Sequence, residues 1–203
     1  MIACEGGQDE SRYCDRSSSA GVVVRGVAVS LTFYIVDVFA EEKYSGNQLA
    51  EVRGGADLSD EALGKIAREM NYSETTFVLA DEEIGGGYDV RIFTLGGEVP
   101  FAGHPTLGTA YVIRNEILAR SVDQVTLNLK AGRIPVTFGD VLWMRQLPPT
   151  FGTTFDPAPV ARALNLETAD LDGRFPVQEV STGLPAIIVP LRGLDALRRC
   201  RVD

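Results

Sequence analysis

The sequence predicts an α+β fold in which a mixed β-sheet wraps around a buried central helix. Short runs rich in β-branched and aromatic residues, separated by turns, recur along the chain from residue 31. The segment 60–70 places its apolar residues on a single face, as a helix lying on a sheet does. The segment 105–113 is apolar or small on nearly every side, which is typical of a helix buried inside a protein.

The individual elements follow from these patterns. Ser59 can cap the first helix, and Pro105 suits the first position of the second, where no amide hydrogen is needed. We expect strands at 32–39, 49–52, 75–79, 88–94, 124–129, 134–138 and 141–146. Further along, we expect a helix at 158–164, strands at 177–181 and 186–189, and a helix at 194–199. Residues 1–30 carry no periodic pattern and are expected to form a poorly ordered extension.

The composition argues against several classes of function. The net charge of −9, from 28 acidic and 19 basic residues, repels phosphate backbones and so disfavours nucleic-acid binding. His104 is the only histidine, which excludes a histidine-rich metal centre. The three cysteines have neither disulfide-framework nor zinc-site spacing, which fits a reducing, cytoplasmic setting.

The most apolar stretch, residues 20–40, does not resemble a membrane or export segment. It contains Arg25 and Asp37, which a spanning helix disfavours. Asp9 and Glu10 precede it, where an export signal carries basic residues. We therefore expect no membrane association.

The start of the apolar helix is the first candidate site. Free amides at residues 103–106 and the helix dipole favour an anion there, and Gly103 allows a ligand to approach the backbone closely. These residues would then bind a carboxylate. The alternative is a capped core helix in which a neighbouring group satisfies His104.

Two other side chains are candidates on chemical grounds. Glu74 lies at the junction between a helix and an apolar strand. The pKa of a partly buried carboxyl group at such a place can be brought toward neutral pH, as proton transfer requires. Asn47, in a Ser-Gly-Asn turn, could donate its side-chain amide to a substrate oxygen. Taken alone, Glu74 could equally be a solvated strand-end residue and Asn47 an ordinary turn residue.

Five sequence blocks, in this order, resemble the PhzF-like (phenazine-biosynthesis-like) proteins. They are Val36-Asp37-Val38-Phe39, Ser45-Gly46-Asn47, the run from Ile66 to Thr75 (IAREMNYSET), Val90-Arg91-Ile92-Phe93-Thr94 and the run from Pro100 to Gly108 (PFAGHPTLG). The resemblance extends from about Leu31 to the last residue. It implies a diaminopimelate-epimerase-like fold, in which two similar halves each wrap a sheet around a central helix, with the active site between them.

The resemblance also implies roles for the candidate residues. Glu74 would carry the proton, Gly103 and His104 would line the substrate site, and Asn47 would lie nearby. The reaction would move a proton within a small carboxylate-bearing substrate, without a cofactor or metal. The sister racemases use two cysteines, whereas Ser45 and Ala102 stand at the corresponding positions here, which argues against two-thiol racemisation.

The resemblance divides the chain into an extension (1–30), a complete first half (31–145), and a linker with the start of a second half (146–203). The family's Asp-Pro-Ala-Thr-Gly-Ser type motif is not among these residues. The alternative to an isomerase is therefore an inactive remnant, or a binding protein that uses the same cleft. An unfinished second sheet would leave an edge and an apolar face exposed, so we expect poor solubility or self-association, for example as a homodimer.

Overall fold

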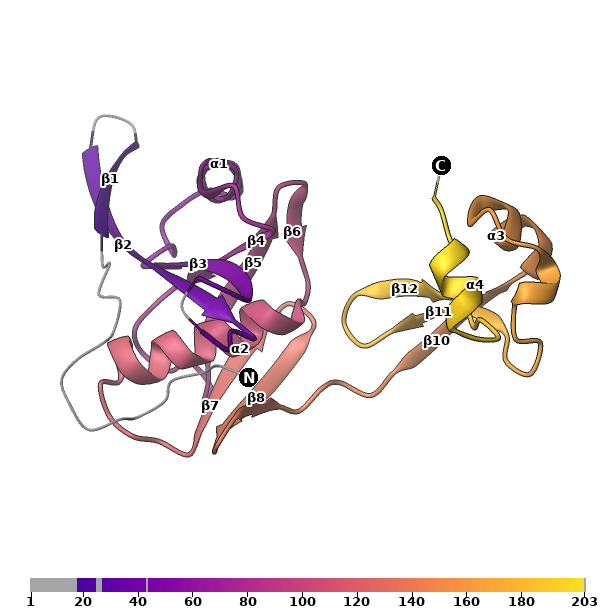
Figure 1. Cartoon of the computed structure of the whole chain (residues 1–203). Coiled ribbons are helices and arrows are strands. Elements are labelled where there is room, and N and C mark those ends of the chain that lie inside the picture. The colour runs from indigo at the N-terminus through magenta and orange to yellow at the C-terminus, as the bar shows by residue number, and fades with distance from the viewer. Residues whose placement is uncertain (1–17, 25–26, 43, 203) are drawn as a thin grey trace. The chain divides into compact units, whose positions relative to one another are not determined.

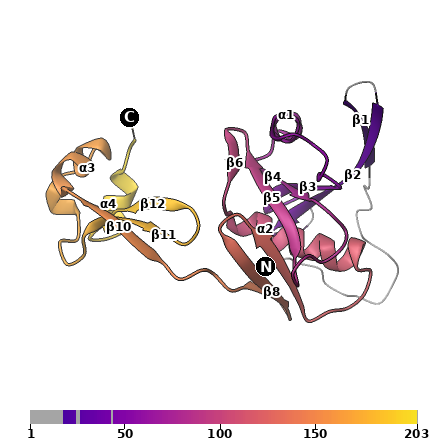
Figure 2. The same cartoon turned by 180° about the vertical axis from the view of Figure 1, so that it is seen from behind.

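The computed structural model describes residues 18–24, 27–42 and 44–202, which fall into two compact units, 1–146 and 147–203. In the first unit, nine strands of the described residues form one sheet (Figures 1 and 2). The strand order is β1-β2-β3-β4-β5-β7-β8-β9, with β6 paired to β5. Two neighbouring pairs, β3–β4 and β5–β7, are parallel, and the other pairs are antiparallel. The sheet is therefore mixed, and the predicted α+β class is confirmed.

The elements of the first unit have the following bounds. The strands are β1 (Ser18–Val24), β2 (Val27–Val38), β3 (Asn47–Arg53), β4 (Glu74–Val78), β5 (Tyr88–Thr94), β6 (Gly97–Val99), β7 (Gln124–Leu129), β8 (Gly132–Phe138) and β9 (Leu142–Met144). The helices are α1 (Asp60–Met70) and α2 (Gly103–Val112), and a π-helical turn, Ile113–Ile117, follows α2.

The start of the sheet differs from our expectation. β2 begins at Val27 and pairs with β1, so the expected boundary at residue 30 falls inside a strand. Valines at 22–24, 27 and 29 give this stretch strand propensity, although it lacks alternation between polar and apolar residues. Residues 1–17, on which the expected disorder mainly rests, lie outside the described residues.

The helices α1 and α2 lie on opposite sides of the strands β3–β5, as both views show (Figures 1 and 2). Ser59 caps α1 as predicted, accepting a hydrogen bond from the amide of Ala62 at 3.2 Å. The apolar face of α1 packs on one face of the sheet, in a core that includes Leu63, Ala67 and Phe77. Burial of this face, not helix propensity, stabilises α1 in place.

The helix α2 is buried on nearly all sides, which confirms the predicted central helix. It contacts β2, β3, β4, β7, β8 and β9. A methyl group built on Gly108 would lie 2.6 Å from Leu49 Cδ2 and 2.9 Å from Val38 Cγ2. Glycine at this position therefore allows α2 to approach β2 and β3 closely.

Gly108→Ala should consequently destabilise the protein, by about 1–3 kcal/mol, because overpacking outweighs the gain in helix propensity. Gly64, in the middle of α1, is the matched control, since a methyl group there would touch only the Arg68 guanidinium at 3.5 Å. Gly64→Ala should be neutral or stabilising, by up to about 1 kcal/mol. Chemical denaturation of both variants checks the pair. Equal changes in the free energy of unfolding, in the same direction, would contradict the close approach of α2 to β2 and β3.

The second unit contains a small antiparallel sheet, ordered β10-β11-β12. Its elements are β10 (Thr150–Phe155), α3 (Pro157–Ala163), a 3₁₀ turn (Thr168–Asp170), β11 (Val177–Ser181), β12 (Pro185–Ile188) and α4 (Leu194–Arg199). Sequence reasoning missed β10, which Gly152 interrupts and whose pairing with β11 shifts register between Phe151 and Thr154.

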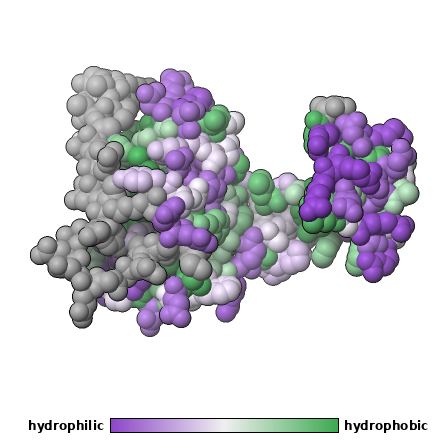
Figure 3. Space-filling model, in the orientation of Figure 1, coloured by the Kyte–Doolittle hydropathy of each residue, from purple (hydrophilic) through white to green (hydrophobic). Residues whose placement is uncertain are grey.

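Large apolar side chains are exposed in this unit, and Figure 3 shows hydrophobic residues at its surface. They are Phe151, Phe175, Leu184, Ile187, Ile188, Leu194, Leu197 and Val202. The self-association expected from the sequence therefore stays a prediction. Sedimentation at increasing protein concentration should show species larger than a monomer, and a single monomeric species throughout would contradict it.

Candidate functional site

The four candidate residues come together where β3, β4 and α2 begin. Asn47 is the first residue of β3, and Glu74 is the first residue of β4. Because these strands are parallel neighbours with Leu49 opposite Glu74, their first residues lie at the same edge of the sheet. Gly103 and His104 are the first two residues of α2, which packs against both strands.

The closest approach in the site is between Glu74 and His104. Oε2 of Glu74 lies 3.6 Å from Nε2 of His104. Both atoms are buried, and neither has a hydrogen-bond partner. A separation of 3.6 Å is too long for a hydrogen bond, so the two atoms face each other without being joined. A buried polar atom without a partner is costly, and a catalytic role is one of the reasons for which a protein retains such an atom.

His104 is only 8% exposed, and this burial lowers the pKa of its imidazole. The carboxylate of Glu74 and the backbone carbonyl of Gln48 act in the opposite direction but are smaller effects. The imidazole is therefore neutral at pH 7. Nδ1, on the other side of the ring, lies 3.1 Å from the side-chain nitrogen of Asn47.

The beginning of α2 provides two free amides, fewer than we expected. The amide of Thr106 donates to the carbonyl of Ala102 at 3.3 Å, and Pro105, in the third helical position and not the first, has no amide hydrogen. Gly103 and His104 keep their amides outside the helical ladder. Ala102 offers no side-chain cap, and the first turn of α2 has no acidic residue, so α2 itself brings no negative charge to its beginning. The carboxyl group beside it is that of Glu74.

The structure adds one residue to the site that sequence reasoning missed. The hydroxyl of Ser73 donates to Oδ1 of Asn47 at 3.4 Å. Ser73 lies directly before Glu74, inside the Asn-Tyr-Ser-Glu-Thr block, but a serine at the end of a helix-to-strand turn has no distinguishing pattern of its own.

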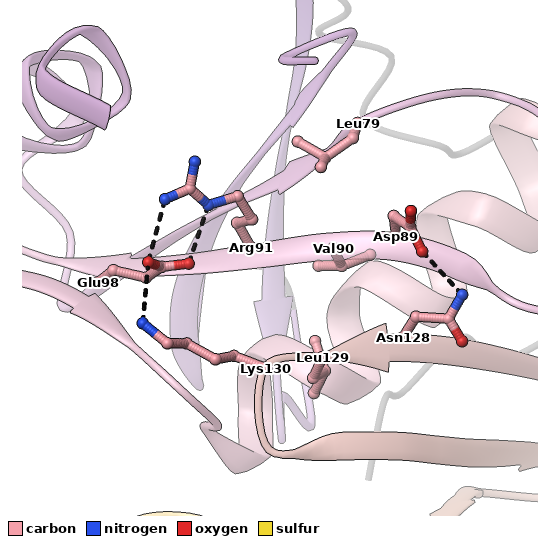
Figure 4. A pocket seen from close by; sticks show the side chains of 8 residues that line it. All are labelled: Leu79, Asp89, Val90, Arg91, Glu98, Asn128, Leu129 and Lys130. Carbon is pink, nitrogen blue, oxygen red and sulfur yellow. Dashed lines mark hydrogen bonds and ion pairs between the residues drawn. The ribbon is translucent and has the colours of Figure 1, made fainter. Parts of the chain in front are cut away.

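A pocket of about 340 Å³ lies away from this site, where β5 and β7 diverge (Figure 4). Its lining residues are Leu79, Asp89, Val90, Arg91, Glu98, Asn128, Leu129 and Lys130. The charged groups are already paired: Glu98 binds Arg91 at 2.9 Å and Lys130 at 3.4 Å, and Asp89 accepts from Asn128 at 2.8 Å. Because the charged side chains of the pocket are engaged with one another and with Asn128, we assign it no role.

Among residues 18–24, 27–42 and 44–202, no group of three or more histidine, cysteine, aspartate or glutamate side chains could hold a metal ion. No helix in the same ranges has the length and apolar character needed to cross a membrane.

The chain is similar to known proteins over most of its length. It is 35% identical to the trans-2,3-dihydro-3-hydroxyanthranilate isomerase of Pseudomonas aeruginosa, across 84% of this chain and 61% of that protein. The isomerase of the same name from Pseudomonas fluorescens is also 35% identical, with the same two coverages. The chain thus spans about three fifths of the length of these relatives.

Solved structures show the same likeness. The structure of a predicted epimerase from Pseudomonas aeruginosa matches with a TM-score of 0.69 and 34% identity, across 84% of this chain and 62% of that one. A PhzF-family phenazine biosynthesis protein from Bacillus anthracis matches with a TM-score of 0.68 and 31% identity, across 84% and 59%. The family model described as phenazine biosynthesis-like protein matches residues 36–203. The chain therefore belongs to the phenazine biosynthesis-like (PhzF) family.

Proposed function

We propose that this protein is a cofactor-independent isomerase that moves a proton within a small carboxylate-bearing substrate. The observation that carries the proposal is the buried, unpartnered oxygen of Glu74 facing the unpartnered Nε2 of a neutral His104, beside the open end of α2. The names of the Pseudomonas relatives support the reaction type, and their substrate, a hydroxylated dihydroanthranilate, supports the substrate class.

The proposed reaction begins with the substrate carboxylate on the amides of Gly103 and His104, where the helix dipole stabilises it. Ionised Glu74 takes a proton from an acidified carbon, and the electron pair of the broken C–H bond enters the conjugated system. The amides at the helix end stabilise the negative charge that develops. Protonated Glu74 then returns the proton to another carbon on the same face, and the double bonds shift.

The alternative is a binding protein that uses the same cleft without chemistry. Calorimetric titration of the chain with trans-2,3-dihydro-3-hydroxyanthranilate, followed by product detection through the change in ultraviolet absorbance, separates the two. An isomerase should show saturable binding and turnover. Binding without turnover would favour the alternative, and the absence of both would contradict the proposed substrate class.

His104→Ala should weaken binding and turnover together, lowering kcat/KM by about 10²-fold, because it removes the side chain that fixes the geometry around Glu74. Thr109→Val is the control, since it breaks the 2.8 Å hydrogen bond between Thr109 and Thr76 one turn further along α2 and leaves the site intact. Steady-state kinetics of both variants checks this. Similar losses in the two would show that any damage to α2 suffices.

A further inference from the structure

Three side chains from separate parts of the sequence form a chain of contacts that ends on His104. The hydroxyl of Ser73 lies 3.4 Å from Oδ1 of Asn47, and Nδ2 of Asn47 lies 3.1 Å from Nδ1 of His104. Ser73 and Asn47 are exposed at the surface, whereas His104 is buried. The contacts therefore run from the surface inward to the ring that faces Glu74.

The direction of these hydrogen bonds follows from the carboxamide of Asn47. A carboxamide has one accepting oxygen and one donating nitrogen. With Oδ1 accepting from Ser73, Nδ2 is the atom directed at His104, and Nδ1 of the ring must then accept. A neutral imidazole carries a single proton, so an accepting Nδ1 places that proton on Nε2.

The opposite side of the ring favours the same arrangement. Nε2 of His104 faces Oε2 of Glu74 at 3.6 Å, and an ionised carboxylate can only accept. A proton on Nε2 is attracted to this oxygen, whereas a bare lone pair there would be repelled. The backbone carbonyl of Gln48 is the competing acceptor, and a ring N–H directed at it would give the other tautomer.

We propose that Ser73 and Asn47 are positioning residues that hold His104 as the neutral tautomer protonated on Nε2. His104 then acts as a hydrogen-bond donor toward Glu74 and the substrate, and Glu74 is left as the only base of the site. This assigns Asn47 to the orientation of His104 and not to contact with the substrate. The catalytic meaning rests on the proposed function, but the tautomer itself does not.

Because His104 is the only histidine, the tautomer can be read without ambiguity. Long-range proton–nitrogen correlation spectra of the full chain, labelled with ¹⁵N-histidine and recorded without substrate at pH 7, distinguish the protonated from the bare ring nitrogen. We expect a protonated Nε2 and a bare Nδ1. A wild-type spectrum with the proton on Nδ1 overturns the proposal, whatever the variants do.

The variants test the cause of the tautomer. Asn47→Asp replaces the donor with an acceptor of the same shape, so Nδ1 should become protonated. Ser73→Ala should give a mixture of tautomers, and Ser73→Thr should restore the wild-type pattern. Gln48→Glu adds the same charge as Asn47→Asp to the next residue, whose side chain points to the other face of β3, and should leave the tautomer unchanged. A bare Nδ1 in Asn47→Asp would overturn the assigned role.

Kinetics then connects the tautomer to the reaction. Asn47→Asp should lower kcat by about 10-fold or more, because the ring is then no longer held as the neutral form protonated on Nε2. Ser73→Ala should lower kcat by less, with Ser73→Thr restoring it. If the spectra show the expected tautomer but no isomerisation is found, the proposed function fails while the positioning of His104 stands. If turnover is found while the proton is on Nδ1, the proposed function stands and the positioning role of Ser73 and Asn47 fails.

Discussion

Replacing Glu74 with glutamine should lower kcat by about 10²-fold or more while leaving substrate affinity within a few-fold of wild type. Glutamine keeps the shape of the side chain but cannot take a proton. Binding should persist, because the amides of Gly103 and His104 remain in place. Steady-state kinetics together with calorimetric titration separates the two effects.

Glu69→Gln is the control for this substitution. It makes the same chemical change at an exposed position in the last turn of α1, five residues away. Turnover should match that of wild type. If Glu74→Gln retained near-normal turnover, Glu74 would not be the base, and its assignment by resemblance would be wrong.

Glu51 should make the protein less stable as the pH rises from about 5 to about 8. Its side chain is fully buried on β3, on the face that packs against α2, and neither carboxyl oxygen has a hydrogen-bond partner. Burial raises its pKa from 4.5 to about 8. Arg53, which lowers this pKa, compensates only in part, since it is itself paired with Asp81.

The direction in which the stability changes with pH follows from proton linkage. Between the unfolded pKa of 4.5 and the folded pKa of about 8, the folded state binds more protons than the unfolded state. The stabilisation from Glu51 is therefore fully present below pH 4.5 and is lost as the pH rises through the folded pKa of about 8. At pH 7, keeping this carboxyl protonated costs on the order of 3 kcal/mol.

Glu51→Gln removes this titration, so the variant should lack the corresponding decline in the free energy of unfolding. The difference between wild type and variant should change by about 3 kcal/mol between pH 5 and pH 8. Denaturant melts across this range measure it. Using the difference removes the contribution of His104, whose lowered pKa acts in the opposite direction, and Glu69→Gln should follow the wild-type curve. Parallel curves for wild type and Glu51→Gln would contradict a protonated Glu51.

The sequence was most informative where one pattern decides the environment of a segment. Residues 105–113 have no polar face, so the burial of α2 could be predicted without any tertiary information. The Ser59 cap and the apolar face of α1 likewise depend on neighbouring residues only. Strand pairing, by contrast, depends on distant segments, which is why β1 and the early start of β2 were missed.

The chemistry of the site was less accessible from the sequence. The Ser73–Asn47–His104 contacts depend on the parallel register of β3 and β4, which no local pattern specifies. Glu51 sits between apolar residues of a short strand, where its burial was not expected, because a glutamate is usually at the surface. The candidate roles of Glu74 and Asn47 depended on the family resemblance, since the chemistry of each residue alone allowed an ordinary structural explanation.

The most direct test of the central claim follows the proton itself. Substrate is incubated with the chain in deuterium oxide, and the product is analysed by proton NMR and mass spectrometry after partial conversion. We predict that wild type forms product whose receiving carbon carries the substrate's own hydrogen, or deuterium where the proton on Glu74 has exchanged with the solvent before its return, and that Glu74→Gln forms at most about one hundredth as much product in the same time. Equal product formation by the two proteins would show that Glu74 does not carry the proton.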